Sequence, residues 1–189
     1  PTVTVNSPTV CAGATATVTA TPTPAGTYNY AWTVPAGATA PGNVATFTTT
    51  ISGTYSVVIT DPTTGCFSTS ASGTVTVNPN PTVTVNSPTV CAGTTATVTA
   101  TPVPAGTYNY AWTVPGGAPA PGNVATFTAT VNGTYSVIIT NPTTTCVSTS
   151  ASGTVTINPN PTVTVNSPTV CAGTPASVTA TPGVAGTYN

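Results

Sequence analysis

The sequence predicts an all-β protein built from tandem β-sandwich domains of about 80 residues each. Residues 1–13 return letter for letter at 81–93 and at 161–173, so the chain repeats with a period of 80 residues. Thr, Val, Ile, Tyr and Trp, which favour strands, alternate along each repeat, and Met, Lys and Arg, which favour helices, are absent. The 21 Pro and 17 Gly residues are typical of many short strands joined by turns.

The period also predicts the domain organisation. Residues 1–80 and 81–160 are identical at 68 of 80 aligned positions, and we expect each to form one repeat. Residues 161–189 are expected to be the truncated start of a third repeat. This third copy stops before the segment that matches Ala31-Trp32, so we expect the chain to be part of a longer protein.

The first two strands of a repeat are predicted by alternation with a period of two. Residues 2–5 alternate Thr with Val, which places Val inward and Thr outward. Residues 15–21 alternate Thr with Ala or Val, so the second strand has a buried face of small side chains. Pro22, Pro24 and Gly26 are expected to end it.

The third strand carries the largest apolar side chains of the repeat. Tyr28, Tyr30, Trp32 and Val34 share one face of this strand. We therefore expect four core aromatic residues in the two complete repeats: Tyr30, Trp32, Tyr110 and Trp112. The alternative is an exposed aromatic platform that stacks on a glycan.

Three further segments complete the repeat. Residues 45–51 predict a strand with Phe47 facing inward, and residues 53–60 predict the most hydrophobic strand. A turn at 61–65 leads into a last strand that closes with 74–77. Six or seven short strands per repeat, with turn signals about every 8 to 12 residues, indicate a β-sandwich.

The near-absence of charge excludes most chemistry. Asp61 is the only acidic residue, and the chain has no Lys, Arg or His. Acid–base catalysis lacks a proton carrier, and no hydroxyl or thiol has a base to activate it. We therefore predict no enzymatic activity, no catalytic residues, no cofactor and no metal site.

Charge also limits the partners. Binding to nucleic acid is driven by Lys and Arg, which are absent, so we predict no nucleic-acid partner. No apolar run reaches the roughly 18 residues that a membrane span needs, so we predict no membrane insertion.

The five cysteines follow the repeat and lie at positions 11, 66, 91, 146 and 171. We expect disulfides within each repeat, Cys11 with Cys66 and Cys91 with Cys146, and a partner for Cys171 outside the chain. Pairing across the repeat junction, Cys66 with Cys91 and Cys146 with Cys171, is one alternative, and buried free thiols are another. Regular cysteines in small domains indicate an oxidising, extracellular setting.

Four motifs in this order resemble a known family over the whole chain: Cys11-Ala12-Gly13, Tyr30-Ala31-Trp32-Thr33-Val34-Pro35, Gly53-Thr54-Tyr55-Ser56-Val57 and Gly65-Cys66. They resemble the immunoglobulin-like and PKD-like tandem repeats of giant Bacteroidota cell-surface adhesins, including the gliding-motility adhesins. The second repeat departs from this pattern because Thr145 stands where the first has Gly65.

The resemblance implies tandem immunoglobulin-like β-sandwich domains arranged as an extended array. It also implies secretion through the type IX pathway and a place at the cell surface or outside the cell. The leading functional hypothesis is a structural stalk or filament segment of an adhesin that provides length and multivalent attachment. We expect self-association into fibres or a long single-chain array, with a surface or glycan receptor as a further partner.

Two other functions fit parts of the sequence. A carbohydrate- or surface-binding β-sandwich module would use Tyr28, Tyr30 or Trp32. Ice binding through the Thr residues of 15–21 would need a flat surface, and the twist of sandwich sheets disfavours it.

Overall fold

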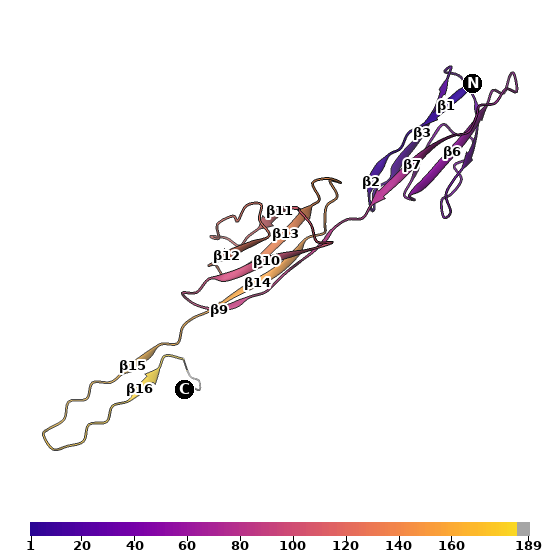
Figure 1. Ribbon diagram of the computed structural model, residues 1–189. Coiled ribbons are helices and arrows are strands. Elements are labelled where there is room, and N and C mark those ends of the chain that lie inside the picture. Colours follow the sequence, from indigo (N-terminus) through magenta and orange to yellow (C-terminus); the bar gives the residue numbers. More distant parts are fainter. Residues whose placement is uncertain (185–189) are drawn as a thin grey trace. The chain divides into compact units, whose positions relative to one another are not determined.

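The computed structural model describes residues 1–184, and all regular structure in these residues is β-strand (Figure 1). The first sandwich contains seven strands: β1 (Thr2–Val5), β2 (Thr9–Cys11), β3 (Ala16–Thr23), β4 (Asn29–Thr33), β5 (Thr46–Thr49), β6 (Gly53–Thr60) and β7 (Ala71–Asn78). The predicted all-β fold class is therefore confirmed. The sequence reasoning missed β2, which is only three residues long.

Two sheets form this first sandwich. One has the order β1-β3-β5 and the other has the order β2-β7-β6-β4. Neighbouring strands run antiparallel, except that β2 pairs in parallel with β7. The division of the strands between the sheets is that of an immunoglobulin-like sandwich.

The second repeat builds the same arrangement from β8 (Thr82–Val85), β9 (Thr89–Cys91), β10 (Ala96–Val103), β11 (Asn109–Thr113), β12 (Thr126–Ala129), β13 (Gly133–Thr140) and β14 (Ala151–Asn158). Its sheets have the orders β12-β10-β8 and β11-β13-β14-β9. The strand registers also repeat, because Cys91 lies opposite Asn158 as Cys11 lies opposite Asn78.

Alternation explains why these segments become strands with one buried face. In β3 the side chains of Ala16, Val18 and Ala20 are buried, whereas Thr17 and Thr21 are exposed. The same period of two buries every second residue of β6. Apolar side chains from both sheets then meet in the space between them.

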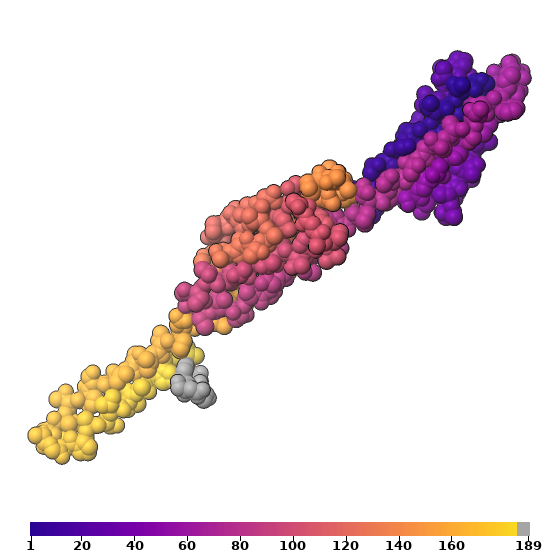
Figure 2. Space-filling view, viewed as in Figure 1, coloured from indigo at the N-terminus to yellow at the C-terminus, as the bar shows by residue number. Residues whose placement is uncertain are grey.

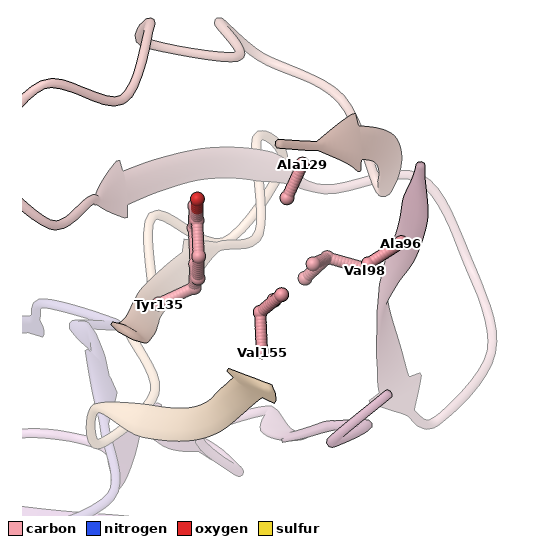
Figure 3. Packing of buried hydrophobic residues seen from close by; sticks show 5 residues of the cluster. All are labelled: Ala96, Val98, Ala129, Tyr135 and Val155. Atoms are coloured by element: carbon pink, nitrogen blue, oxygen red, sulfur yellow. The ribbon is translucent and has the colours of Figure 1, made fainter. Parts of the chain in front are cut away.

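The buried residues of the second sandwich illustrate this meeting. Figure 3 shows Tyr135 from β13 and Val155 from β14 pointing toward Val98 from β10, with Ala96 and Ala129 beside them. The corresponding cluster of the first sandwich is centred on Tyr55, Val18 and Ala16. The core is therefore filled largely by small and β-branched residues around one tyrosine.

The described residues of the third copy form one antiparallel pair of strands, β15 (Val163–Val165) and β16 (Ala180–Pro182). Val163 lies opposite Pro182, as Val3 lies opposite Pro22 in the first repeat. The side chain of Val163 is 64% exposed, whereas that of Val3 is 8% exposed. The two strands therefore keep the register of the repeat without a second sheet to cover them.

The chain divides into two compact units whose boundaries differ from those of the repeats. The first unit contains Pro1–Val83, Pro102–Ala111 and Ile138–Ser150, and the second contains the remainder. Figure 2 shows the strands of the first sandwich, in indigo and violet, as a closely packed body. The first compact unit thus contains the first repeat together with two segments of the second.

Candidate functional site

The disulfide of this structure joins the two repeats. Cys11 is bonded to Cys146, with 5.5 Å between their Cα atoms and 135 residues between them in the sequence. The predicted pairs Cys11–Cys66 and Cys91–Cys146 are therefore wrong in this structure. The junction-crossing alternatives are not formed either, because Cys66, Cys91 and Cys171 are exposed free thiols.

Strand topology explains why Cys11 does not reach Cys66. Cys11 lies opposite Asn78, the last residue of β7. Cys66 follows β6, whose end lies near the start of β7 because the two strands are antiparallel. From Ala71 to Asn78 the eight-residue β7 spans about 23 Å at roughly 3.3 Å per residue. A disulfide needs Cα atoms within about 7 Å, so these cysteines lie at opposite ends of one sandwich.

Both bonded cysteines belong to the first compact unit. The Sγ atoms of Cys11 and Cys146 lie 3.8 Å and 3.7 Å from the carbonyl oxygen of Thr144. Beside Thr144 is a small hollow, which we call the junction surface, lined by Asn78, Pro79, Pro81, Pro104, Tyr108, Asn141 and Thr144. Cys146 is fully buried there, although its counterpart Cys66 in the first repeat is exposed.

A tight turn holds Cys146 in place. The backbone amides of Thr143 and Thr144 donate to Oδ1 of Asn141 at 2.9 and 3.2 Å, and the amide of Asn141 donates to the carbonyl of Cys146 at 2.9 Å. Thr145 has a φ of 61°, in the region that favours glycine, and its counterpart Gly65 has a φ of 74°. The turn therefore keeps its conformation despite the change from glycine to threonine.

The first repeat builds the same turn around the only acidic residue. The amides of Thr63 and Thr64 donate to Oδ1 of Asp61 at 2.8 and 3.2 Å. These two hydrogen bonds, the one from Thr63 first, lower the pKa of the Asp61 carboxyl below its ordinary value. The carboxylate therefore caps a turn, and no second acidic group accompanies it.

The predicted core aromatics lie at the edge of the core. Trp32 and Tyr30 are partly buried and pack against the fully buried residues. The Trp32 Nε1 donates to the carbonyl of Val44 at 2.9 Å, and the ring meets Phe47 edge-on with centroids 4.9 Å apart. These contacts correct the expectation that Trp32 is the centre of the core.

The second repeat shows the same arrangement. Trp112 and Tyr110 are partly buried. The Trp112 Nε1 donates to the carbonyl of Val124 at 2.9 Å, and its ring meets Phe127 edge-on at 4.9 Å. The aromatic strand therefore contributes packing and one internal hydrogen bond in each repeat.

The sequence reasoning missed the residue at the core centre. Tyr55 is fully buried, and its hydroxyl donates to the carbonyl of Ile51 at 2.9 Å and lies 2.8 Å from Oγ1 of Thr49. A tyrosine near the start of this strand whose hydroxyl bonds back to the preceding corner is a hallmark of immunoglobulin-like sandwiches. The Gly-Thr-Tyr sequence at the start of β6 was the available signal.

Residues 1–184 contain no group of His, Cys, Asp or Glu side chains that could hold a metal ion. The described part of the chain also contains no helix that could cross a membrane.

No family model and no curated protein matches this chain. Among solved structures, an I-band fragment of titin is 16% identical over 84% of this chain and 65% of the fragment, with a TM-score of 0.46. The four N-terminal immunoglobulin domains of a Dscam1 isoform are 16% identical over 81% of this chain and 44% of that structure, with a TM-score of 0.36. The chain thus spans less than two thirds of each, and we base no functional argument on similarities of this size.

Proposed function

We propose that this chain is a structural segment of an extracellular or cell-surface adhesin, where it forms part of a stalk or filament. The observation that carries this proposal is the bond between Cys11 and Cys146, because it fastens one repeat to the next. A bond between two domains adds nothing to a binding site within either domain. It does hold the domains together when the array is pulled.

The repetition of the units supports the same role. The two sandwiches share sheet orders and strand registers as well as sequence. In repeat arrays each unit contacts chiefly its neighbours, so added copies extend the array. A disulfide fits an oxidising compartment outside the cell, which is where such an adhesin would act.

Self-association belongs to the same proposal. The strands β4 and β5 end their sheets, and neither contains a charged residue. Natural sheet edges often carry charge, which prevents pairing with other chains. Uncharged edges and a net charge of −1 favour lateral association of neighbouring arrays into fibres.

The alternative function, a carbohydrate- or surface-binding module, would need free aromatic faces. The Trp32 ring is instead held by Phe47 and by the carbonyl of Val44. Acrylamide quenching of tryptophan fluorescence compares the two proposals. Weak quenching is expected for a packing role, and quenching close to that of free tryptophan, reversed by a glycan, would favour the binding module.

Electron microscopy of the native assembly tests the stalk proposal. We expect fibres with a periodicity of one domain length, about 35 to 45 Å for a sandwich with strands of roughly ten residues or fewer. Reduction of the disulfides should leave the domains folded and make the fibres more flexible. Dispersed globular particles without periodicity would contradict the proposal.

A further inference from the structure

The 80-residue period sorts the five cysteines into two types. Cys11, Cys91 and Cys171 occupy the same position of the repeat, which we call the first-type position. Cys66 and Cys146 occupy the other, second-type position. The observed disulfide joins a first-type cysteine to the second-type cysteine of the following repeat.

Cys91 has the same local structure as the bonded Cys11. Each ends a short strand that pairs in parallel with the last strand of its sandwich. The amides of Ala12 and Ala92 both donate at 2.8 Å to the carbonyl of the asparagine that ends this last strand. Cys91 is thus held in the bonded conformation while its thiol is exposed.

Cys66 likewise has the same local structure as the bonded Cys146. Its carbonyl accepts from the amide of Asp61 at 2.8 Å, and its amide donates to Oγ1 of Thr64 at 3.4 Å. In the second repeat the corresponding distances are 2.9 Å and 3.4 Å. The main difference is burial, since Cys66 is exposed and Cys146 is fully buried.

The surroundings of the two second-type cysteines differ in the same sense. Tyr108, which lines the junction surface, is 6% exposed. Its counterpart Tyr28 is only partly buried, although the hydroxyls of both donate to the carbonyl of the proline four residues earlier. Thr144 is partly buried, and its counterpart Thr64 is exposed. The first repeat therefore presents, uncovered, the groups that the second repeat uses at its link.

We infer that Cys66 and Cys91 are half-sites of further disulfides of the same kind, each of which binds the complementary cysteine of another 80-residue repeat. Cys66 takes a first-type cysteine and Cys91 takes a second-type cysteine. The partner is a repeat of this sequence because the link that is already formed consists of these same residues. The inference deepens the proposed stalk function, since each junction of the array would then carry one covalent link.

The chemistry needs an oxidant, and a low-molecular-weight disulfide such as oxidised glutathione supplies it. The two cysteine thiols lose two protons and two electrons and form one S–S bond. The oxidised glutathione takes up these protons and electrons, its own S–S bond breaks, and two glutathione thiols leave.

A chain in which residues 81–160 are duplicated in tandem provides the missing partner for Cys91. It has seven cysteines, five from the original chain and two from the duplicated segment. After refolding in a glutathione buffer we expect two disulfides, Cys11 to the first Cys146 and Cys91 to the second Cys146. Both the original and the duplicated chain should then have three free thiols, and Cys91→Ser in the duplicated chain should abolish only the second bond.

Peptide mapping by mass spectrometry identifies the bonds, with pepsin or thermolysin because trypsin finds no Lys or Arg. The first-type peptides differ after the shared Cys-Ala-Gly: Ala14-Thr15, Thr94-Thr95 and Thr174-Pro175. Pairing within repeats, which leaves one free thiol in either chain, would overturn the inference. So would a second Cys146 that stays free in the folded, duplicated chain. Either result leaves the stalk proposal to be decided by the fibre images.

Discussion

Gly153 is a position where a single methyl group should disrupt the fold. It is buried in β14, where a Cβ atom would lie 2.9 Å from Cγ1 of Val85 and still closer to the carbonyl oxygen of Asn86. These contacts are shorter than van der Waals contact, and one of them is with backbone that cannot rotate away. We expect Gly153→Ala to lower the free energy of unfolding by about 2 kcal/mol, as overpacking does elsewhere. Urea denaturation followed by tryptophan fluorescence measures this loss.

The chain offers a matched control for this variant. A Cβ atom on Gly116 would meet no atom within 4 Å, and the first repeat has Ala36 at this position. Gly116→Ala should therefore change the free energy of unfolding by less than about 0.5 kcal/mol. Equal effects of the two substitutions would contradict the close approach of β14 to the Val85–Asn86 segment.

Asp61 should make the first sandwich sensitive to acid. The amides of Thr63 and Thr64 lower its pKa in the folded state, so protonation is harder there than in the unfolded chain. The stabilisation is present at pH values above the unfolded pKa, near 3.9, and is lost as the pH falls through the folded pKa. Asp61→Asn should remove this loss, because Asn141 makes the same two hydrogen bonds in the second repeat.

Thermal melting followed by circular dichroism between pH 2 and pH 7 checks this expectation. The melting temperature of the wild-type chain should fall at the acid end, and that of Asp61→Asn should fall less. An equal fall in both chains would show that another group is responsible.

At the scale of the element, the corner before β6 and the corner before β13 differ by one hydrogen bond. Tyr55 contacts both Thr49 and the carbonyl of Ile51. Tyr135 donates to the carbonyl of Val131 at 2.9 Å, and Ala129 replaces the threonine. We expect Tyr135→Phe to cost about 1 kcal/mol and Tyr55→Phe to cost more, because Tyr55→Phe removes two interactions. Chemical denaturation of both variants measures the difference.

An alkaline titration provides an independent readout of the same corner. Burial raises the pKa of the Tyr135 hydroxyl, an effect that the hydrogen bond to Val131 partly offsets. The folded state therefore favours the neutral hydroxyl, and stability is lost as the pH rises above about 10 toward the folded pKa. Tyr135→Phe should lessen this alkaline loss, and an unchanged pH profile would contradict the burial.

Alternation with a period of two was sufficient to predict β1, β3 and β6, because each buries every second side chain. It could not predict β2, which has three residues and pairs with β7, more than 60 residues away in the sequence. Nor could size alone place the aromatics. The largest ring of the repeat, Trp32, lies at the core edge because its Nε1 must reach a carbonyl, whereas Tyr55 lies at the centre.

The disulfide pairing could not be predicted from spacing either. A regular spacing is unchanged when each first-type cysteine is shifted to a partner one repeat later. Only the strand order shows that Cys11 and Cys66 lie at opposite ends of one sandwich. The sequence therefore predicts the domains well, and the link between them requires the three-dimensional structure.

At the scale of the whole molecule, the disulfide should determine how far the chain extends under force. Residues between Cys11 and Cys146 cannot be stretched while the bond is intact, because the bond carries the load past both sandwiches. In single-molecule pulling from the two termini, reduction should add roughly 450 Å of contour length, at about 3.4 Å for each of 135 residues. Cys11→Ser should give the longer extension without reduction, and equal extensions in all conditions would show that the bond is absent.

The bond also determines what a protease can do to the molecule. Cys11, Cys146 and the backbone between them form a closed covalent ring. One cleaved peptide bond anywhere between Ala12 and Thr145 opens this ring but releases no fragment, so the molecule survives the cut in one piece. Where successive rings overlap, as half-sites at Cys66 and Cys91 would allow, every junction would tolerate the same damage. For a strand exposed outside the cell, this redundancy protects continuity even where it cannot protect each domain.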